Sequence, residues 1–186
     1  MRVALIGMLL SAVAAVPPGG EYRVLMASAS GPVPARTGGF GEMTCYQCHW
    51  DNPLNDFGGR LSLAGVPDTY IPGERYPITV AIAHPELVKG GFQMSARFED
   101  GKNAGAFRSP DQLTQPISNE DTQVTYIQHT SLGARRAQGE SRWEVEWTAP
   151  AEGGTVVFHL AGNASNGDAS PLGDFVYTAS STSRPR

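Results

Sequence analysis

Charged side chains are scarce in this chain, and no stretch of it concentrates positive charge. Lys, Arg, Asp and Glu make up 17% of the 186 residues, and the formal net charge is −4. A surface that binds nucleic acid needs a field of positive charge, which this composition does not supply. We therefore expect no nucleic acid partner.

The sequence also lacks the motifs of several enzyme and metal-site classes. It contains no nucleophile elbow and no Ser-His-Asp order, so nothing supports a hydrolase. No second C-x-x-C and no H-x-x-x-H accompany its two cysteines, although zinc sites use four nitrogen or sulfur ligands in spaced pairs. We expect an electron-transfer or binding protein and not an enzyme.

Long apolar runs are absent except near the N-terminus. Arg2 precedes the apolar run Val3–Val16, which is too short for a comfortable permanent bilayer span and is typical of an export signal. Ala12–Ala14 and Ala27–Ala29 both offer small residues for cleavage, and we favour the second. We predict a signal peptide at 1–29, with an uncleaved anchor as the alternative. After cleavage no permanent transmembrane span is expected, and the protein would be periplasmic, cell-surface or secreted.

The only two cysteines, Cys45 and Cys48, form a C-x-x-C-H string with His49. This string is the attachment signature of c-type haem. Each thiol can add to one of two adjacent vinyl groups, and the imidazole can then bind the iron from below the ring. We predict one covalent haem c on Cys45 and Cys48, with His49 as the proximal iron ligand. A redox disulfide or dithiol is an alternative, although a thioredoxin-like dithiol belongs at the start of a helix in an α/β protein.

The second axial ligand decides between electron transfer and ligand chemistry at the iron. We favour His129, because it ends a predicted strand and a sheet would hold its imidazole at low entropic cost. A structural hydrogen-bonding role is the alternative for this residue. His84, in a loop, is the next candidate. Met94, Met43 and His159 follow, with Met94 expected in the core, and an open site is the remaining case.

Short strand-like runs bounded by Gly, Pro, Asn or Asp fill residues 67–178. In 143–147, Trp and Val alternate with Glu, which is the period of a half-buried strand. Short strands without intervening helical patterns predict an all-β, antiparallel immunoglobulin-like sandwich, with Trp143, Trp147 and Phe158 in its core. The predicted strands are 76–82, 92–98, 123–129, 143–147, 155–160 and 175–177.

The segments that flank the sandwich have a different composition. Gly and Pro punctuate residues 30–66, which predicts an irregular haem-attachment segment whose last part, from Leu61, begins the packed region. The low-complexity residues 179–186 are expected to be a flexible tail. Asp100-Gly101 predicts the tip of a hairpin within the sandwich.

An oxygen-rich stretch precedes the last predicted strand. Asn163, Asn166, Asp168 and Asp174 are punctuated by glycine and are candidates for calcium binding. Their spacing is not that of an EF-hand, and turns rich in Asn and Asp usually satisfy backbone groups.

Several of these motifs resemble a known family. Trp147–Pro150, Gly153–Phe158, Ala161–Asp168 and Gly173–Tyr177 resemble the second half of a reeler-type domain, and Gly91–Arg97 with His129–Ser131 resembles the first half. The chain is similar in particular to the bacterial branch called choice-of-anchor V, in which a C-x-x-C-H segment precedes the domain. The resemblance spans about residues 40–180. It implies an immunoglobulin-like sandwich in an exported protein. Some relatives carry a C-terminal anchoring tail, which is not expected here because Ala179–Arg186 has no apolar span.

Two functions follow from these observations. In the first, the protein is an exported monohaem cytochrome that passes single electrons to a redox partner protein, with the sandwich as scaffold and docking surface. In the second, it is a surface interaction or adhesion module whose haem is structural or senses gases. A five-coordinate iron would favour sensing or peroxidase-like chemistry.

Overall fold

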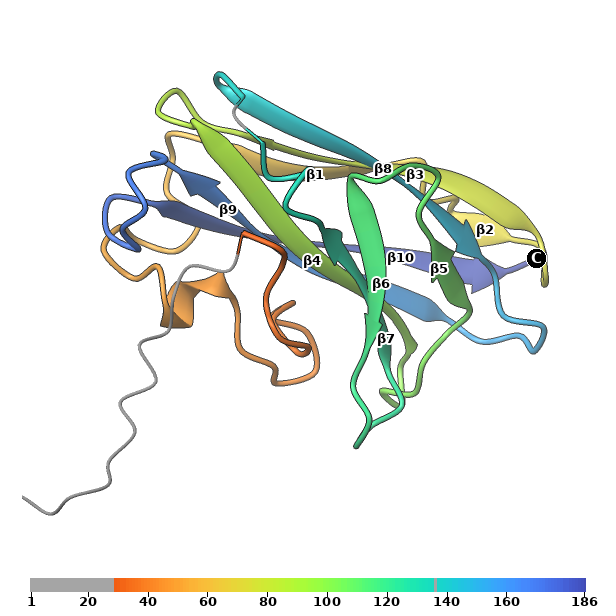
Figure 1. Cartoon of the computed structure of the whole chain (residues 1–186). Coiled ribbons are helices and arrows are strands. Elements are labelled where there is room, and N and C mark those ends of the chain that lie inside the picture. Colours follow the sequence, from red (N-terminus) through yellow and green to blue (C-terminus); the bar gives the residue numbers. More distant parts are fainter. Residues whose placement is uncertain (1–28, 136) are drawn as a thin grey trace, which may run out of the picture.

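The computed structural model describes residues 29–135 and 137–186. They form two β-sheets packed face to face, as Figure 1 shows. The predicted signal peptide, residues 1–29, lies outside the described residues except for its last position. None of the helices in the described part of the chain has the length and apolarity that a membrane crossing requires.

One sheet has four strands in the order β1-β3-β8-β5, and the other has six in the order β2-β10-β9-β4-β7-β6. Neighbouring strands are antiparallel, except that β2 pairs with β10 in parallel. The elements are η1 (Cys45–Gln47), β1 (Arg60–Ala64), β2 (Thr69–Tyr70), β3 (Arg75–Ala83), β4 (Lys89–Phe98), β5 (Ala106–Arg108), β6 (Thr114–Ser118), β7 (Thr125–His129), β8 (Glu140–Thr148), β9 (Val156–Ser165) and β10 (Phe175–Pro185).

The core lies between the two sheets and contains the predicted aromatic residues. Trp143, Trp147 and Phe158 are fully buried, and the rings of Trp147 and Phe158 meet edge to face with centroids 4.9 Å apart. Each indole N–H donates to a backbone carbonyl at 3.0 Å, Trp143 to Gly133 and Trp147 to Ala104. The predicted antiparallel sandwich is therefore confirmed. The predicted hairpin tip at Asp100-Gly101 is also confirmed, because the N–H of Gly101 donates to the carbonyl of Phe98 at 2.8 Å.

The structure corrects two of the predicted boundaries. Residues 179–185 are not a tail, because β10 continues to Pro185 and pairs with β9 as far as Ser183. The run is rich in Ser and Thr and lacks apolar alternation, yet its backbone pairs with β9 as far as Ser183 and with β2 at Arg184 and Pro185. At the other end, β1 already pairs with β3, so the irregular segment ends at residue 59 and not at 66.

The outer face of the six-stranded sheet is polar and nevertheless buried. Side chains alternate along a strand, so the inward Phe92 and Met94 on β4 alternate with Gln93, Ser95 and Arg97 on the outer face. Segment 30–59 covers this outer face, as the red and orange ribbon in Figure 1 shows. The candidate site lies where this segment meets the sheet.

Candidate functional site

A buried ion pair fixes the segment upstream of the C-x-x-C-H string. Glu42 pairs with Arg97 on the outer face of β4, and both side chains are less than 10% exposed. Tyr126 on β7 donates to the same carboxylate at 2.5 Å, and Thr37 donates to its other oxygen at 2.6 Å. The guanidinium of Arg97 also donates to Tyr126 at 2.6 Å. We call Glu42, Arg97, Tyr126 and Thr37 the clamp.

Backbone contacts extend this attachment along the segment. The amide oxygen of Gln93 accepts from the N–H of Arg36 at 2.7 Å, and its nitrogen donates to the carbonyl of Val33 at 3.1 Å. The side-chain nitrogen of Gln93 also donates to the side-chain oxygen of Gln128 on β7 at 2.8 Å. These contacts satisfy the side-chain amide of Gln93 and attach the segment to the sheet.

Two asparagines fix the chain downstream of the string. Asn55 donates its N–H to the carbonyl of Val176 and accepts from the N–H of Thr178 through its side chain, both on β10. Asn52 donates to the carbonyl of Asp174 at 3.1 Å. The string is thus held at both ends against β4, β9 and β10.

The string itself forms a capped turn of 3-10 helix, η1. Thr44 caps it, because its hydroxyl accepts from the N–H of Tyr46 while its own N–H donates to the side chain of Gln47. The carbonyl of Cys45 accepts from the N–H groups of Cys48 and His49 at 3.1 and 3.0 Å. Positions three apart lie on one side of such a helix, so the turn presents its two thiols on the same side.

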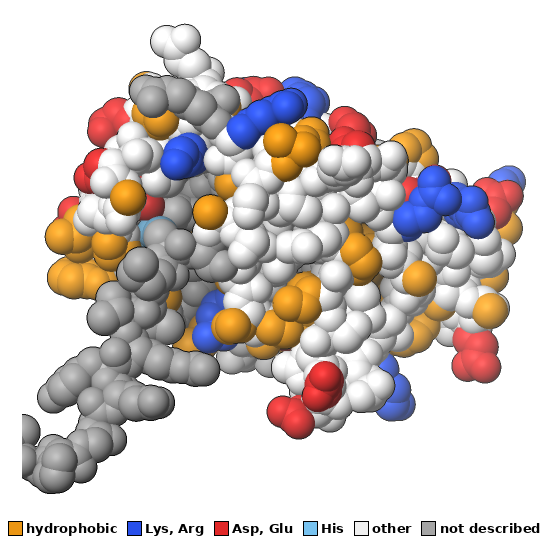
Figure 2. Space-filling model, viewed as in Figure 1, with side chains coloured by type: hydrophobic (Ala, Val, Ile, Leu, Met, Phe, Trp, Pro, Cys, Tyr) orange, Lys and Arg blue, Asp and Glu red, His pale blue; other side chains and the backbone are white. Residues whose placement is uncertain are grey.

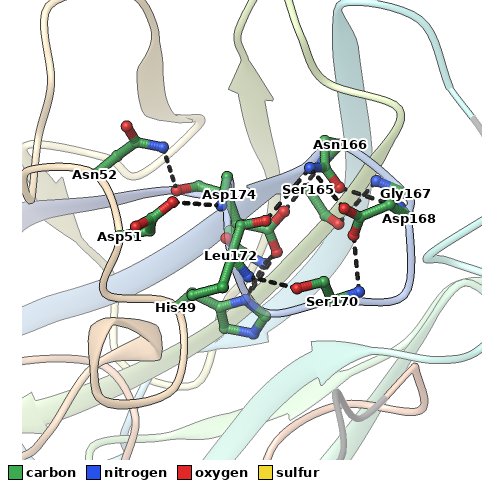
Figure 3. A network of polar contacts seen from close by, with 12 residues as sticks. His49, Asp51, Asn52, Ser165, Asn166, Gly167, Asp168, Ser170, Leu172 and Asp174 are labelled. Atoms are coloured by element: carbon green, nitrogen blue, oxygen red, sulfur yellow. Dashed lines mark hydrogen bonds and ion pairs between the residues drawn. The ribbon is translucent and has the colours of Figure 1, made fainter.

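Among the described residues, the side-chain contacts of His49 are made through one ring nitrogen, Nδ1. Its Nδ1 lies 2.8 Å from a carboxylate oxygen of Asp174. This carboxylate is buried, and the Nδ1–H can donate a hydrogen bond to it. The side-chain nitrogen of Asn163 lies 3.2 Å from Nδ1 and donates to the same carboxylate oxygen at 3.0 Å. Figure 3 shows the other ring nitrogen facing away from this network. The carboxylate orients the ring from its Nδ1 side and leaves Nε2 directed away from it, which is the arrangement that metal-ligating histidines in proteins use.

Asp174 is ionised although it is buried. Burial alone would raise the pKa of this carboxyl, but hydrogen bonds from His49, Asn163 and the backbone N–H of Asn166 outweigh it, so the pKa lies below its ordinary value. The loop after β9 places this carboxylate, and its polar groups bond within the loop. Asn166 accepts from the N–H of Asp168, and Asp168 accepts from the N–H of Ser170. These are Asx turns, so the oxygen-rich stretch is explained by backbone capping and by support of His49.

The two thiols are free and half-buried. Burial is the largest effect on Cys45, and with the nearby Cys48 it raises the pKa of the Cys45 thiol to about 12. Reactive dithiols need the opposite shift, a lowered pKa that exposes a thiolate. A redox-dithiol function therefore has no electrostatic support in this turn.

The two histidines ranked first as distal ligands each have contacts of their own in the structure. His129 is 6% exposed, and its Nδ1 accepts from the N–H of Phe92 at 2.9 Å, against the backbone of β4. His84 stacks on Phe175 with ring centroids 3.7 Å apart and accepts from the N–H of Glu86. Ligation of iron by His129 stays a prediction that neither of these contacts tests.

The other predicted candidates differ in their surroundings. Met94 is fully buried in the core, as predicted, whereas Met43 is 52% exposed on the segment. His159 lies on β9 beneath the segment, with the ring of Phe40 edge-on at 5.4 Å. Burial and, to a smaller extent, the charge of Arg97 lower the pKa of His159, so its imidazole is neutral at pH 7.

Apolar side chains are exposed along the segment around η1. Six of the nine exposed large hydrophobic residues in the described chain lie between 33 and 57, and Trp50 and Phe57 are the most prominent of the aromatics at 59% and 105% exposure. Figure 2 shows hydrophobic side chains gathered at the end of the molecule where Figure 1 places this segment. Exposed apolar side chains gathered in this way are typical of a binding surface.

The residues present fit a covalent haem. Two thiols on one side of a rigid turn, an imidazole with Nε2 available and an apolar surround are the elements that such a group uses. No cluster of three or more His, Cys, Asp or Glu side chains suited to a metal ion occurs among the residues that the structure describes. A haem iron does not depend on one, because the ring itself supplies four of its ligands.

Sequence reasoning singled out Cys45, Cys48 and His49 for haem, which stays a prediction, and it missed the partner of the histidine. Asp174 was singled out only as a candidate calcium ligand. Its contact with His49 spans 125 positions and depends on how the segment folds back over the sheet. No local pattern could have predicted this pairing.

Comparison with solved structures identifies the type of fold. No family model and no curated protein matches the chain. The reelin-N domain of F-spondin is similar in structure, with a TM-score of 0.52 and 22% identity over 76% of this chain and 96% of that one. The reeler domain of human F-spondin has a TM-score of 0.49 and 22% identity over 73% and 95%. A cohesin module from a Clostridium perfringens family 33 glycoside hydrolase has a TM-score of 0.48 and 16% identity over 69% and 96%. Identities this low bear on the fold alone, and the chain has a reeler-like β-sandwich.

Proposed function

We propose that the protein is an exported monohaem c-type cytochrome that carries single electrons. Cys45 and Cys48 would hold the haem covalently and His49 would bind its iron through Nε2. The haem, when bound, supplies the one-electron chemistry. The sandwich would act as a rigid scaffold and as the surface on which a redox partner protein docks.

One observation carries this proposal: a buried, ionised carboxylate holds Nδ1 of the histidine that follows the C-x-x-C turn. A carboxylate in that position orients the ring and raises the basicity of its other nitrogen. A histidine that only filled space would have no need of a desolvated carboxylate, since burial of a charge is costly unless it is compensated. The pairing is therefore best explained by a metal on Nε2.

The chain's own residues would set the conditions for electron transfer. The clamp and the asparagine contacts hold η1 at both ends. The protein around the iron would therefore rearrange little when the iron changes its charge. Asp174 would place a negative charge on the far side of the imidazole that holds the iron, which would favour the oxidised state. The exposed Trp50 and Phe57 would lie at the rim of the site, where a partner protein can approach closely.

A redox titration of the purified holoprotein tests this function. The protein is produced together with a cytochrome c maturation system, and its visible spectrum is followed against electrode potential. We expect one reversible transition that involves a single electron. A protein that remains colourless under these conditions, or whose haem does not reduce reversibly, would contradict the proposal.

The second candidate is a surface interaction module with a structural or gas-sensing haem, and the exposed aromatic residues of the segment favour it. The same preparation separates the two candidates. A reduced protein that binds carbon monoxide at once has an open axial position and favours sensing. A spectrum that carbon monoxide leaves unchanged favours electron transfer.

A further inference from the structure

The chain that follows the C-x-x-C-H turn and the loop after β9 meet in one surface. The carboxylate of Asp51 accepts from the N–H of Gly173 at 3.1 Å. The side-chain nitrogen of Asn166 donates to the carboxylate of Asp168 and to the carbonyl of Leu172, each at 3.3 Å. Figure 3 shows these contacts as one network. We call this surface the turn face and define it as residues 50–57 together with residues 166–174.

The ionisable side chains of the turn face are all acidic. It contains no lysine or arginine, and its acidic residues are Asp51, Asp56, Asp168 and Asp174. The whole sequence has 18 acidic and 14 basic residues, so the two kinds are equal in number outside the turn face. Lys89 borders this surface at Gly167, and the half-buried Arg36 lies near Cys45. The surplus of negative charge therefore lies beside the attachment turn.

The turn face also exposes large apolar side chains. Trp50 is 59% exposed and Phe57 is fully exposed. Leu54 and Leu172 are exposed as well. Interfaces between proteins combine aromatic and aliphatic side chains with a polar rim, and this surface offers both.

The charge of the turn face distinguishes between the occupants that an apolar surface could have. Anionic lipids would be repelled by the carboxylates. A second copy of this chain would bring two surfaces of the same sign together. A protein surface with Lys or Arg around an apolar centre complements both properties, and opposite charges speed the encounter of transient partners.

We propose that the turn face docks a redox partner protein whose contact surface is positively charged around an apolar centre. This inference rests on the proposed haem function and specifies the kind of partner. The carboxylates steer the partner to the end of the molecule that carries the attachment turn. Trp50 and Phe57 supply the apolar contact once it arrives.

The first test measures the oxidation of the reduced holoprotein by two small complexes of opposite charge. Tris(phenanthroline)cobalt(III) is a trication and ferricyanide is a trianion. Each takes one electron from the haem iron, which passes from iron(II) to iron(III), and becomes the cobalt(II) complex or ferrocyanide.

Ionic strength separates the two reactions. Raising it from about 0.01 M to about 0.1 M shortens the Debye length from about 30 Å to about 10 Å. The rate constant with the cobalt complex should fall by about tenfold, and the rate constant with ferricyanide should rise. Rate constants that change in the same direction, or in the reverse of these directions, would overturn the proposal.

Two double variants separate the turn face from the net charge. Asp51→Asn with Asp168→Asn removes two charges, and asparagine keeps an oxygen that can accept the same hydrogen bonds. Glu99→Gln with Glu152→Gln changes the net charge equally at the other end of β9, where β4 ends and β9 begins. The first variant should lose most of the salt dependence with the cobalt complex, and the second should keep it. Equal losses would overturn the assignment to the turn face.

A second measurement does not depend on haem. The chain has three tryptophans, and Trp143 and Trp147 are fully buried, so dissolved quenchers reach the fluorescence of Trp50 in the haem-free full-length protein. Asp51→Asn with Asp168→Asn should weaken quenching by caesium, strengthen quenching by iodide and leave quenching by neutral acrylamide unchanged. Unchanged caesium and iodide quenching would overturn the charge assignment.

The two measurements also separate this inference from the proposed function. A parent protein without haem contradicts the proposed function, whatever the quenchers show. A haem that is reduced reversibly but is oxidised without the predicted salt dependence contradicts this inference alone.

The other occupants are tested with the same tryptophan and with sedimentation. Vesicles of phosphatidylcholine and phosphatidylglycerol should leave the emission of Trp50 unshifted, and a shift to shorter wavelength would overturn the proposal in favour of a membrane. The holoprotein should sediment as a monomer. A dimer that Trp50→Ala dissociates would overturn the proposal in favour of a second copy.

Discussion

At the scale of single residues, the contact between His49 and Asp174 decides how the iron would behave. The carboxylate is buried and ionised, and it faces Nδ1, the ring nitrogen that would not bind the iron in the proposed site. A negative charge there makes the ligand more basic and stabilises the oxidised iron. We predict that Asp174→Asn raises the reduction potential of the holoprotein, measured by redox titration.

Asp168→Asn is the matched control for that prediction. Asp168 lies in the same loop but is exposed and does not contact His49. Its replacement should leave the potential nearly unchanged. A shift of the same size in both variants would mean that the loop as a whole, and not the carboxylate on His49, sets the potential.

The lowered pKa of Asp174 also predicts how stability depends on pH. A carboxyl whose pKa is lower in the folded than in the unfolded state stabilises the fold above the unfolded value of about 4. This contribution is lost as the pH falls through the folded-state pKa. Thermal unfolding of the haem-free protein between pH 2 and 7 should therefore show a steeper acid loss in the parent than in Asp174→Asn. Parallel curves would contradict the prediction.

At the scale of elements, the clamp is what attaches the irregular segment to the sheet. Removing one partner of a buried ion pair leaves the other charge uncompensated and costs about 3 to 5 kcal/mol. We predict that Glu42→Gln loosens residues 30–59, so that their backbone amides exchange hydrogen faster while those of β4 and β9 remain protected. Hydrogen exchange followed by mass spectrometry measures both regions in one experiment.

The double variant Glu42→Gln with Arg97→Met is the companion test. It removes both charges, so the segment should recover part of the protection that the single variant loses. If the single variant exchanges no faster than the parent, the ion pair does not hold the segment.

Elements differ in how well the sequence predicts them. The strand at 143–147 was evident because large apolar and charged residues alternate in it. The end of β10 was not, because Ser180–Ser183 carries no apolar signal and becomes a strand only through its pairing with β9. The sequence did not predict β5 and β6 for a similar reason, since these strands are short and are defined by the strands they pair with. The C-x-x-C-H string was evident because its spacing is local, whereas Asp174 reaches His49 only through the tertiary fold.

At the scale of the whole molecule, one aromatic core joins the two sheets. Trp147 is fully buried and packs against Tyr70 and Phe158. Truncation of such a side chain costs about 3 to 5 kcal/mol. This is a large share of the free energy of unfolding of a typical domain, which is about 5 to 15 kcal/mol. We predict that Trp147→Ala lowers the free energy of unfolding of the haem-free protein by this amount in urea titrations.

Trp50→Ala provides the comparison, because this tryptophan is 59% exposed. Surface replacements usually change stability by less than about 0.5 kcal/mol. Equal losses in the two variants would contradict the core assignment of Trp147. The same measurement shows whether the site can be altered without unfolding its scaffold.

The central claim is that this sandwich carries a covalent haem on the turn that precedes it. Intact-protein mass spectrometry under denaturing conditions, after production with a cytochrome c maturation system, tests it most directly. We predict a mass increase of one haem that survives denaturation, maps to the peptide containing Cys45 and Cys48, and is absent from a variant in which both are alanine. Recovery of only the unmodified mass from the parent protein, under conditions that mature a known cytochrome c, would contradict the account.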